Sequence, residues 1–255
     1  MHMLEPVLLA VRLSLPEAGL MALLMFLSGI VRGFTGFGSS ALVVTSMGLI
    51  TPARELVPMM NLLEILASLH LLPRVWRQID WSVIGWIVLL GFLTVPLGQW
   101  VLLLLPVAPM RLLVSVLVLS AALLLWRQRE PWMAPNARTW MATGAVAGLM
   151  NGLAAVGGMG AMLMFLGTRI PALQIRATLI GLLFIMGIYA GSVALANGLM
   201  NSVIAARVGL MIGPLVLGVM LGSHCFTRSQ PASFRHLTLL LMIILALCGI
   251  VHSLL

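Results

Sequence analysis

The sequence has no lysine and only six acidic residues, and charged residues make up just 8% of its 255 residues. Soluble globular domains carry about 25% charged residues. Hydrophobic residues make up 62% of the chain, and its mean hydropathy is +1.16. Because so few charges cannot form a water-facing surface, lipid or other helices must surround most side chains. The composition excludes a soluble domain and predicts an all-α, polytopic transmembrane helical bundle.

Residue patterns that mark other protein classes are also missing. The two cysteines, Cys225 and Cys248, lack metal-ligand spacing and predict neither a zinc site nor a disulfide framework. We find no nucleophile with its base and no phosphate loop with its lysine, so we expect no enzyme, no cofactor and no metal. The net charge of +8 comes from fourteen arginines placed in short breaks between apolar runs. This placement predicts membrane topology and not nucleic-acid binding.

Apolar runs bounded by proline, arginine or glycine predict the membrane segments. They cover residues 18–31, 36–50, 55–72, 82–105, 110–126, 140–151, 154–168, 175–197, 203–223 and 236–254. A full crossing needs about 20 residues. The six long runs are therefore predicted to span the membrane, and the four short ones are not.

The four short runs form two adjacent pairs, each joined by a glycine-rich break. The breaks are GFTGFG (residues 33–38) and GLAAVGGMG (residues 152–160). We interpret each pair as a re-entrant helical hairpin, with two short tilted spans as the alternative. Both arrangements return the chain to the side where it started, so the topology of the other segments does not depend on the choice.

Arginine placement indicates the orientation. With the N-terminus outside, nine arginines lie in inside breaks and three in outside breaks. The inside set is Arg74, Arg77, Arg127, Arg129, Arg138, Arg169, Arg176, Arg228 and Arg235, and the outside set is Arg12, Arg54 and Arg111. The positive-inside rule then predicts a multi-pass protein of the bacterial inner membrane with its N-terminus outside.

The two halves of the chain resemble each other. A shift of 119 residues places Gly29 on Gly148 and Pro52 on Pro171, and a shift of 124 places Gly98 on Gly222. We therefore expect two repeats, 1–130 and 131–255, within one integral membrane domain. Each repeat contains one hairpin and three spans, and because three is odd, the repeats must be inverted.

Inverted repeats with interrupted helices are typical of secondary transporters that work by alternating access. Helices that begin near Gly38 and Gly157 would point unbonded N–H groups into the membrane, an arrangement that favours an anion. Glycine in membrane helices also serves close helix packing, which fits Gly29 and Gly148 equally well. A duplicated accessory or assembly factor that does not transport is the alternative function.

Arg32 is the main candidate for binding the anion, because a guanidinium can hold an oxyanion through two hydrogen bonds. The shift of 119 places it on Asn151, so each hairpin has a hydrogen-bond donor at the same point. Snorkelling to the interface is the other explanation for Arg32. The predicted substrate-binding residues are Arg32, Gly33, Gly36, Gly38, Ser39, Asn151, Gly152, Gly157 and Gly158.

A second polar group lies in the segment 55–72. Asn61, Glu64 and Ser68 follow at spacings of three and four, which places them on one helix face. The buried carboxyl of Glu64 could carry a coupling proton, act as a neutral hydrogen-bonding group, or pair with Arg207. We predict that these four residues serve proton coupling or line the pathway.

The glycine-rich hairpins resemble those of the sulfite exporter TauE/SafE family of bacterial permeases. The resemblance rests on GIVRGFTGFG (residues 29–38), GLMNGLAAVGGMG (residues 148–160), and the prolines that follow them. It implies export of sulfur oxyanions or organosulfonates such as sulfite. The sequence departs from the family's first glycine run at Gly38-Ser39-Ser40. We expect a small anion and the lipid bilayer as partners, no nucleic acid, and leave a homodimer open.

Overall fold

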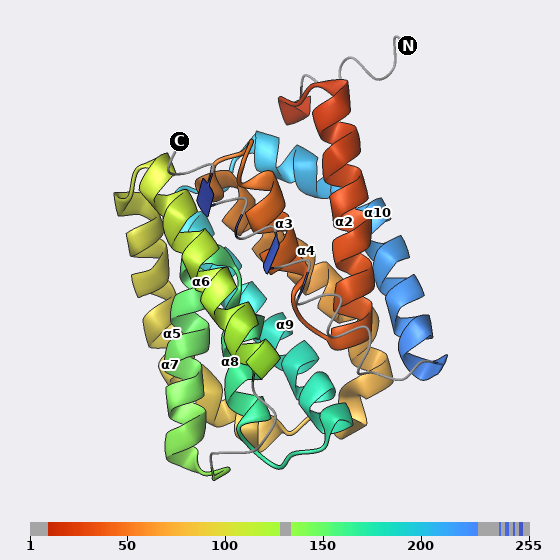
Figure 1. Ribbon diagram of the computed structural model, residues 1–255, viewed down its shortest axis with the longest axis vertical. Coiled ribbons are helices and arrows are strands. Elements are labelled where there is room, and N and C mark those ends of the chain that lie inside the picture. Colours follow the sequence, from red (N-terminus) through yellow and green to blue (C-terminus); the bar gives the residue numbers. More distant parts are fainter. Residues whose placement is uncertain are drawn as a thin grey trace.

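The computed structural model describes residues 10–127 and 134–228, with a few further residues between Leu240 and Val251. Every element in this part of the chain is helical (Figure 1). The elements are α2 (Leu15–Thr35), α3 (Ser39–Met47), α4 (Ala53–Val75), the 3-10 helix η1 (Trp76–Gln78), α5 (Trp81–Leu104), α6 (Val107–Arg127), α7 (Ala137–Ala154), α8 (Gly157–Leu166), α9 (Ala172–Ala196) and α10 (Ser202–Arg228). The predicted all-α fold is confirmed. Most of the predicted segment 236–254 lies outside the described residues, as do Arg129, Arg235 and Cys248.

Capping residues explain where several helices begin. Ser14 and Glu17 form a reciprocal capping box at α2, and Asp80 Oδ1 accepts from the N–H of Val83 at α5. Pro52 and Pro171 occupy the N-cap positions of α4 and α9 with nearly the same extended backbone angles. The residues that the 119-residue shift superposes therefore begin corresponding helices.

Six of the described helices are long and apolar enough to cross a membrane: α2, α4 with η1, α5, α6, α9 and α10. Five of these match predicted spans. The exception is α2, whose 21 residues extend beyond the predicted run 18–31 at both ends. The helix is therefore longer than the predicted run, and by length and composition alone it could cross a membrane. The capping box at its start and Gly36 at its end set limits that apolar periodicity does not mark.

The short helices are the second members of the two pairs. α3 has nine residues and α8 has ten, whereas α7 has 18. Each pair is thus one longer and one shorter helix, and not two short ones as predicted. The breaks themselves are shorter than predicted, with Gly36 and Gly38 in the first and Ala155 and Val156 in the second.

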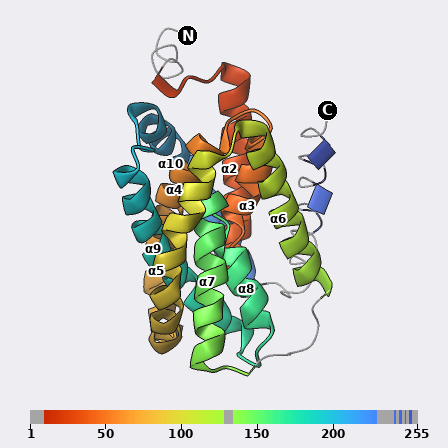
Figure 2. The same ribbon diagram turned by 90° about the vertical axis from the view of Figure 1, so that its left-hand side faces the viewer.

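α4 and α9 pack against each other and are the most deeply buried of the long helices. They lie in the middle of the view in Figure 1 and toward the left side of Figure 2. α2 lies along α10, and α7 lies along α5, so each longer paired helix packs on a helix from the other half of the chain. Both contacts use glycine. Cβ atoms on Gly29 and Gly218 would meet the opposing backbone at the α2–α10 contact, as would one on Gly144 at the α5–α7 contact. These close contacts hold each helix pair against a long helix from the other half of the chain.

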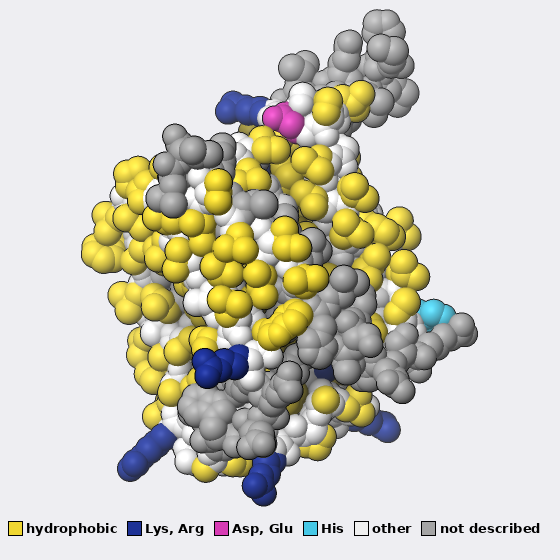
Figure 3. All heavy atoms as spheres, in the orientation of Figure 1, with side chains coloured by type: hydrophobic (Ala, Val, Ile, Leu, Met, Phe, Trp, Pro, Cys, Tyr) yellow, Lys and Arg dark blue, Asp and Glu magenta, His cyan; other side chains and the backbone are white. Residues whose placement is uncertain are grey.

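The outer surface carries the apolar side chains that the composition predicts. Exposed leucine, isoleucine, valine and tryptophan side chains come from all the long helices, and yellow side chains cover most of the face in Figure 3. Arginines gather at the lower end of that view, where α4 ends and α9 begins. A lipid-facing belt with one basic end is the surface expected of a membrane protein.

Candidate functional site

Arg32 lies entirely inside the protein, one turn before the end of α2, with no exposed surface. Its Nη2 donates to Ser68 Oγ on α4 at 2.6 Å. Nε and Nη1 have no hydrogen-bond partner among the described residues. The guanidinium therefore points into the bundle and not toward an interface, so the snorkelling alternative is wrong.

Glu64 lies one turn before Ser68 on α4 and is 3% exposed. Its Oε1 accepts hydrogen bonds from Ser40 Oγ at 2.6 Å and from Ser39 Oγ at 3.3 Å. These two serines are the first residues of α3. The other carboxyl oxygen, Oε2, has no hydrogen-bond partner among the residues that the structure describes. The carboxyl group therefore links α4 to the start of α3 through Oε1, whereas Oε2 remains able to form a further hydrogen bond.

Two asparagines add further unused polar atoms. Asn61 lies one turn before Glu64 on α4, and Asn151 lies near the end of α7, and neither is more than 1% exposed. Both amide atoms of each side chain lack a partner. Buried polar groups are normally satisfied, so such a group needs an explanation such as a ligand or water. Asn61, Glu64, Ser68 and Arg32 form what we call the central polar cluster, together with Ser39 and Ser40.

The two chain breaks lie against each other and against α9. A Cβ on Gly158, at the start of α8, would lie 3.1 Å from Phe37 Cβ in the first break. A Cβ on Gly36 would lie 3.0 Å from Arg176 Cγ. Gly36 and Gly38 have φ of +83° and +89°, a conformation that favours glycine. The structure thus brings the start of α8 beside the break that follows Arg32.

Gly157 lies against α7 of its own pair, whereas Gly33 and Gly152 lie against α10 and α5, which belong to neither pair. Both lie within helices, and Cβ atoms there would overlap backbone oxygens of Val219 on α10 and Val95 on α5. Close helix packing accounts for both residues. We therefore leave them out of the site proposed below.

Arg207 is not the partner of Glu64. Its Nη1 contacts Glu55 Oε2 at 2.5 Å, and its Nε donates to the carbonyl of Val11 at 2.9 Å. Glu55 lies at the start of α4, about two turns before Glu64. The predicted alternative of an Arg207–Glu64 pair is wrong, because the two residues lie at different depths.

Arg176 has a role that sequence reasoning missed. We predicted an inside arginine near a helix start, but its side chain is buried, with 8% of the residue exposed. Its Nε and Nη2 donate to the carbonyls of Phe34 and Gly33 at 3.0 and 2.5 Å. These are among the last carbonyls of α2, which lack partners within the helix. Arg176 therefore fixes the end of α2 directly after Arg32.

The described residues contain no group of three or more His, Cys, Asp or Glu side chains placed to hold a metal ion. The polar atoms of the central cluster are instead nitrogen donors, hydroxyls and one carboxyl group. A guanidinium with two unused nitrogens can hold an oxyanion, and a carboxyl oxygen can accept a proton.

Comparison with known proteins assigns the family. No curated protein and no solved structure matches the chain significantly. The family model for the sulfite exporter TauE/SafE matches residues 21–248. This range includes the first helix pair from residue 21 onward, the whole second pair, the central helices and every residue of the central polar cluster. Since the match extends over nearly the whole sequence, the chain belongs to the sulfite exporter TauE/SafE family of membrane transporters.

Proposed function

We propose that the protein is a secondary transporter of small sulfur-containing oxyanions or organosulfonates, such as sulfite, and that it exports them by alternating access. Membership in a transporter family supports this function and is consistent with a protein that is not an enzyme. The observation that carries the proposal is Arg32, a fully buried arginine with two nitrogens that lack partners.

Arg32 would bind the anion because its unused donors otherwise cost free energy. An unsatisfied buried donor typically costs about 1–3 kcal/mol, and more when it is charged. An oxyanion that accepts from Nε and Nη1 removes this cost and supplies the opposite charge. Asn61 and Asn151 would bind the same ligand or water molecules beside it.

The starts of α3 and α8 would complete the anion site. Gly38 and Val156 occupy their N-cap positions, and neither residue has a polar side chain to accept from the first N–H groups. A helix N-terminus carries a partial positive charge that favours an anion. Phe37 lies close to Gly158, which supports a site where the N-termini of α3 and α8 both lie near the same ligand. Gly36, Gly38, Ser39, Gly157 and Gly158 remain in the proposed site.

Inverted repeats account for the pattern of helix contacts. Under the repeat shifts, α2 corresponds to α7 and α5 corresponds to α10. The α2–α10 contact therefore corresponds to the α7–α5 contact, and α4 corresponds to α9. This pattern supports two repeats, 1–130 and 131–255, around a pseudo-two-fold axis between α4 and α9. Rocking of one paired unit against the other would expose the site to each side in turn.

The helix pairs would be re-entrant hairpins. The nine residues of α3 and ten of α8 span about 15 Å, half of the roughly 30 Å hydrocarbon core. Trp140 near the start of α7 packs against Phe165 near the end of α8, with ring centroids 5.2 Å apart. The second pair therefore begins and ends at one level. We place the N-terminus outside in the bacterial inner membrane, and a homodimer remains a prediction.

Glu64 would carry the coupling proton, because its carboxyl group lies in the same buried cluster as Arg32. Its unused Oε2 could accept the proton without breaking the hydrogen bonds that Ser39 and Ser40 make to Oε1. Arg207 pairs with Glu55, so it is not part of the proposed proton-coupling group.

The test is stabilisation of the purified protein by anions, measured as the change in melting temperature. A ligand that binds only the folded state raises this temperature with concentration. The compounds tested are the anions sulfite, sulfate, thiosulfate, sulfoacetate and chloride, and the zwitterionic sulfonate taurine. We expect a sulfur oxyanion to stabilise the wild type and Arg207→Gln but not Arg32→Gln. Arg207 is a matched control because it is also a buried arginine, at 4% exposure.

If no anion stabilises the wild type, transport of these anions is rejected and the accessory-factor function becomes the better explanation. If Arg32→Gln is stabilised as much as the wild type, the protein binds the anion elsewhere. Uptake into proteoliposomes under a pH gradient would then separate transport from binding alone.

A further inference from the structure

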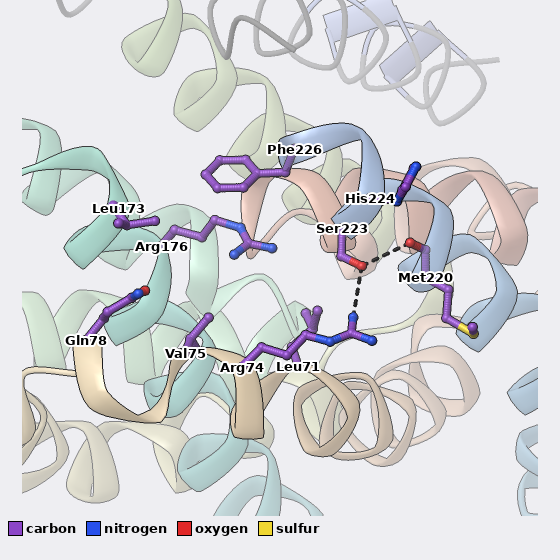
Figure 4. Close-up of a pocket in the computed structure, with 10 residues that line it drawn as sticks. All are labelled: Leu71, Arg74, Val75, Gln78, Leu173, Arg176, Met220, Ser223, His224 and Phe226. Atoms are coloured by element: carbon purple, nitrogen blue, oxygen red, sulfur yellow. Dashed lines mark hydrogen bonds between the residues drawn. The ribbon is translucent and has the colours of Figure 1, made fainter. Parts of the chain in front are cut away.

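A pocket of about 580 Å³ lies at the end of the bundle where α4 and α10 end and α9 begins. Figure 4 shows the side chains of Arg74, Arg176 and Ser223 directed into the space between these three helices. The complete lining consists of Leu71, Arg74, Val75, Gln78, Leu173, Arg176, Met220, Ser223, His224 and Phe226. We call this space the vestibule.

The vestibule is positively charged. Arg74 and Arg176 contribute two guanidinium groups, and the lining contains no acidic residue. Arg176 is fixed in place by the end of α2 and lies over the Phe226 ring at 4.2 Å. Arg74 is exposed, and its Nη1 donates to Ser223 Oγ at 3.2 Å. A concave site lined by one sign of charge concentrates small ions of the opposite sign.

The vestibule lies on the same face of α4 as the central polar cluster. Glu64, Ser68, Leu71 and Val75 follow at spacings of four, three and four along the helix. The next positions beyond Ser68 on this face therefore belong to the vestibule. Leu71 lines the pocket but is 1% exposed, so its side chain lies between the pocket and the buried cluster.

We propose that the vestibule is a second, outer binding site for small oxyanions, from which they reach Arg32 once Leu71 moves aside. This inference rests on the proposed function for the class of ion, but the site itself is defined by different residues. Arg74 concentrates the anion, and Arg176 both lines the vestibule and holds the end of α2. The arginine-rich end faces the cytoplasm in the orientation proposed above, so the vestibule is the entrance used for export.

The test measures the charge preference of the vestibule directly. A thiol is introduced by Ser223→Cys in a background with Cys225→Ser and Cys248→Ser. Its labelling rate is compared for an anionic and a cationic methanethiosulfonate reagent of similar size. We expect the anionic reagent to react faster. Arg74→Gln should lower the anionic-to-cationic rate ratio by about sevenfold, because one charge removed at about 7 Å in water changes each of the two rates by about threefold, in opposite directions.

Arg77→Gln is the matched control, because Arg77 is an exposed arginine near the end of the same helical segment that does not line the vestibule. Its rate ratio should equal that of the parent protein, and added salt should reduce the effect of Arg74→Gln. Equal ratios in the Arg74→Gln and Arg77→Gln proteins would overturn the proposal. Failure of both reagents to label the folded protein would also overturn it.

The two proposals fail separately. The labelling ratio does not require binding at the centre, so Arg32→Gln should leave it unchanged. If Arg74→Gln lowers the labelling ratio but no anion stabilises the protein, the vestibule proposal is retained and the proposed transport function is rejected. If anions stabilise the protein through Arg32 but the ratio does not respond, only the vestibule is rejected.

Discussion

Substitution of Gly152 by alanine separates a packing glycine from a binding glycine. Gly152 lies in α7 against α5, and its added Cβ would overlap Val95 O and lie 3.0 Å from the backbone nitrogen of Gln99. Ordinary van der Waals contacts require about 3.5 Å. The two helices must therefore separate by at least about 0.5 Å at Gln99, and by more at Val95. The α5–α7 contact should loosen along several turns.

Overpacking of this kind typically costs about 1–3 kcal/mol. For a chain of this size, each kcal/mol lowers the melting temperature by about 2–4 °C. We therefore expect Gly152→Ala to melt about 3–10 °C lower than the wild type in detergent. Anion-induced stabilisation of the folded protein should persist, because the Cβ would contact α5 and not the central polar cluster.

Gly85→Ala is the matched control on the opposing helix α5. Nothing lies within 4 Å of a Cβ at Gly85, and alanine favours a helix by about 1 kcal/mol over glycine. Its melting temperature should be unchanged or slightly higher. The packing argument is refuted if the melting temperature of Gly152→Ala equals that of Gly85→Ala. Loss of anion binding at unchanged stability would return Gly152 to the binding site.

Further substitutions test three other parts of the structure. Leu71→Ala should raise the labelling rate of a thiol introduced by Ser68→Cys at least several-fold, because it removes the side chain between the vestibule and the central polar cluster. The rate is measured with a thiol reagent small enough to enter the vestibule. Glu64→Gln should make anion-induced stabilisation independent of pH, whereas stabilisation of the wild type should weaken as pH rises. Arg207→Met should lower the melting temperature more than Glu55→Gln, because Arg207 is buried and also holds Val11, whereas the side chain of Glu55 is 40% exposed.

Composition and periodicity were sufficient to predict α4, α5, α6, α9 and α10, because lipid exposure imposes long apolar runs whatever the details of packing. They did not predict the full lengths of α2 and α7. Arg32 could also be identified, since an ionisable group within an apolar segment is rarely accidental. The pairing of Glu64 with Ser39 and Ser40 could not be predicted. It depends on the angle at which α3 leaves the first break, which is set by positive φ at Gly36 and Gly38.

Several arginines make contacts that could not be predicted from the sequence. Three of those counted for orientation also bind backbone carbonyls near helix ends: Arg54 near the end of α5, Arg111 after α3, and Arg176 at the end of α2. In lipid such carbonyls have no water to accept from, so a nearby guanidinium satisfies them. Topological counting treats these residues as equivalent, although each partner lies far away in the sequence.

The charges of the central polar cluster would connect anion binding to proton binding in the function proposed above. Arg32 and Glu64 together are neutral when both are ionised, and both are buried. An arriving monoanion would leave one uncompensated negative charge, which is costly at this depth. One proton on Glu64 restores neutrality. If that proton lies on Oε2, which has no partner, it also converts this oxygen from an acceptor into a donor toward the anion. A single proton would therefore supply both the charge and the hydrogen bond that the bound anion requires.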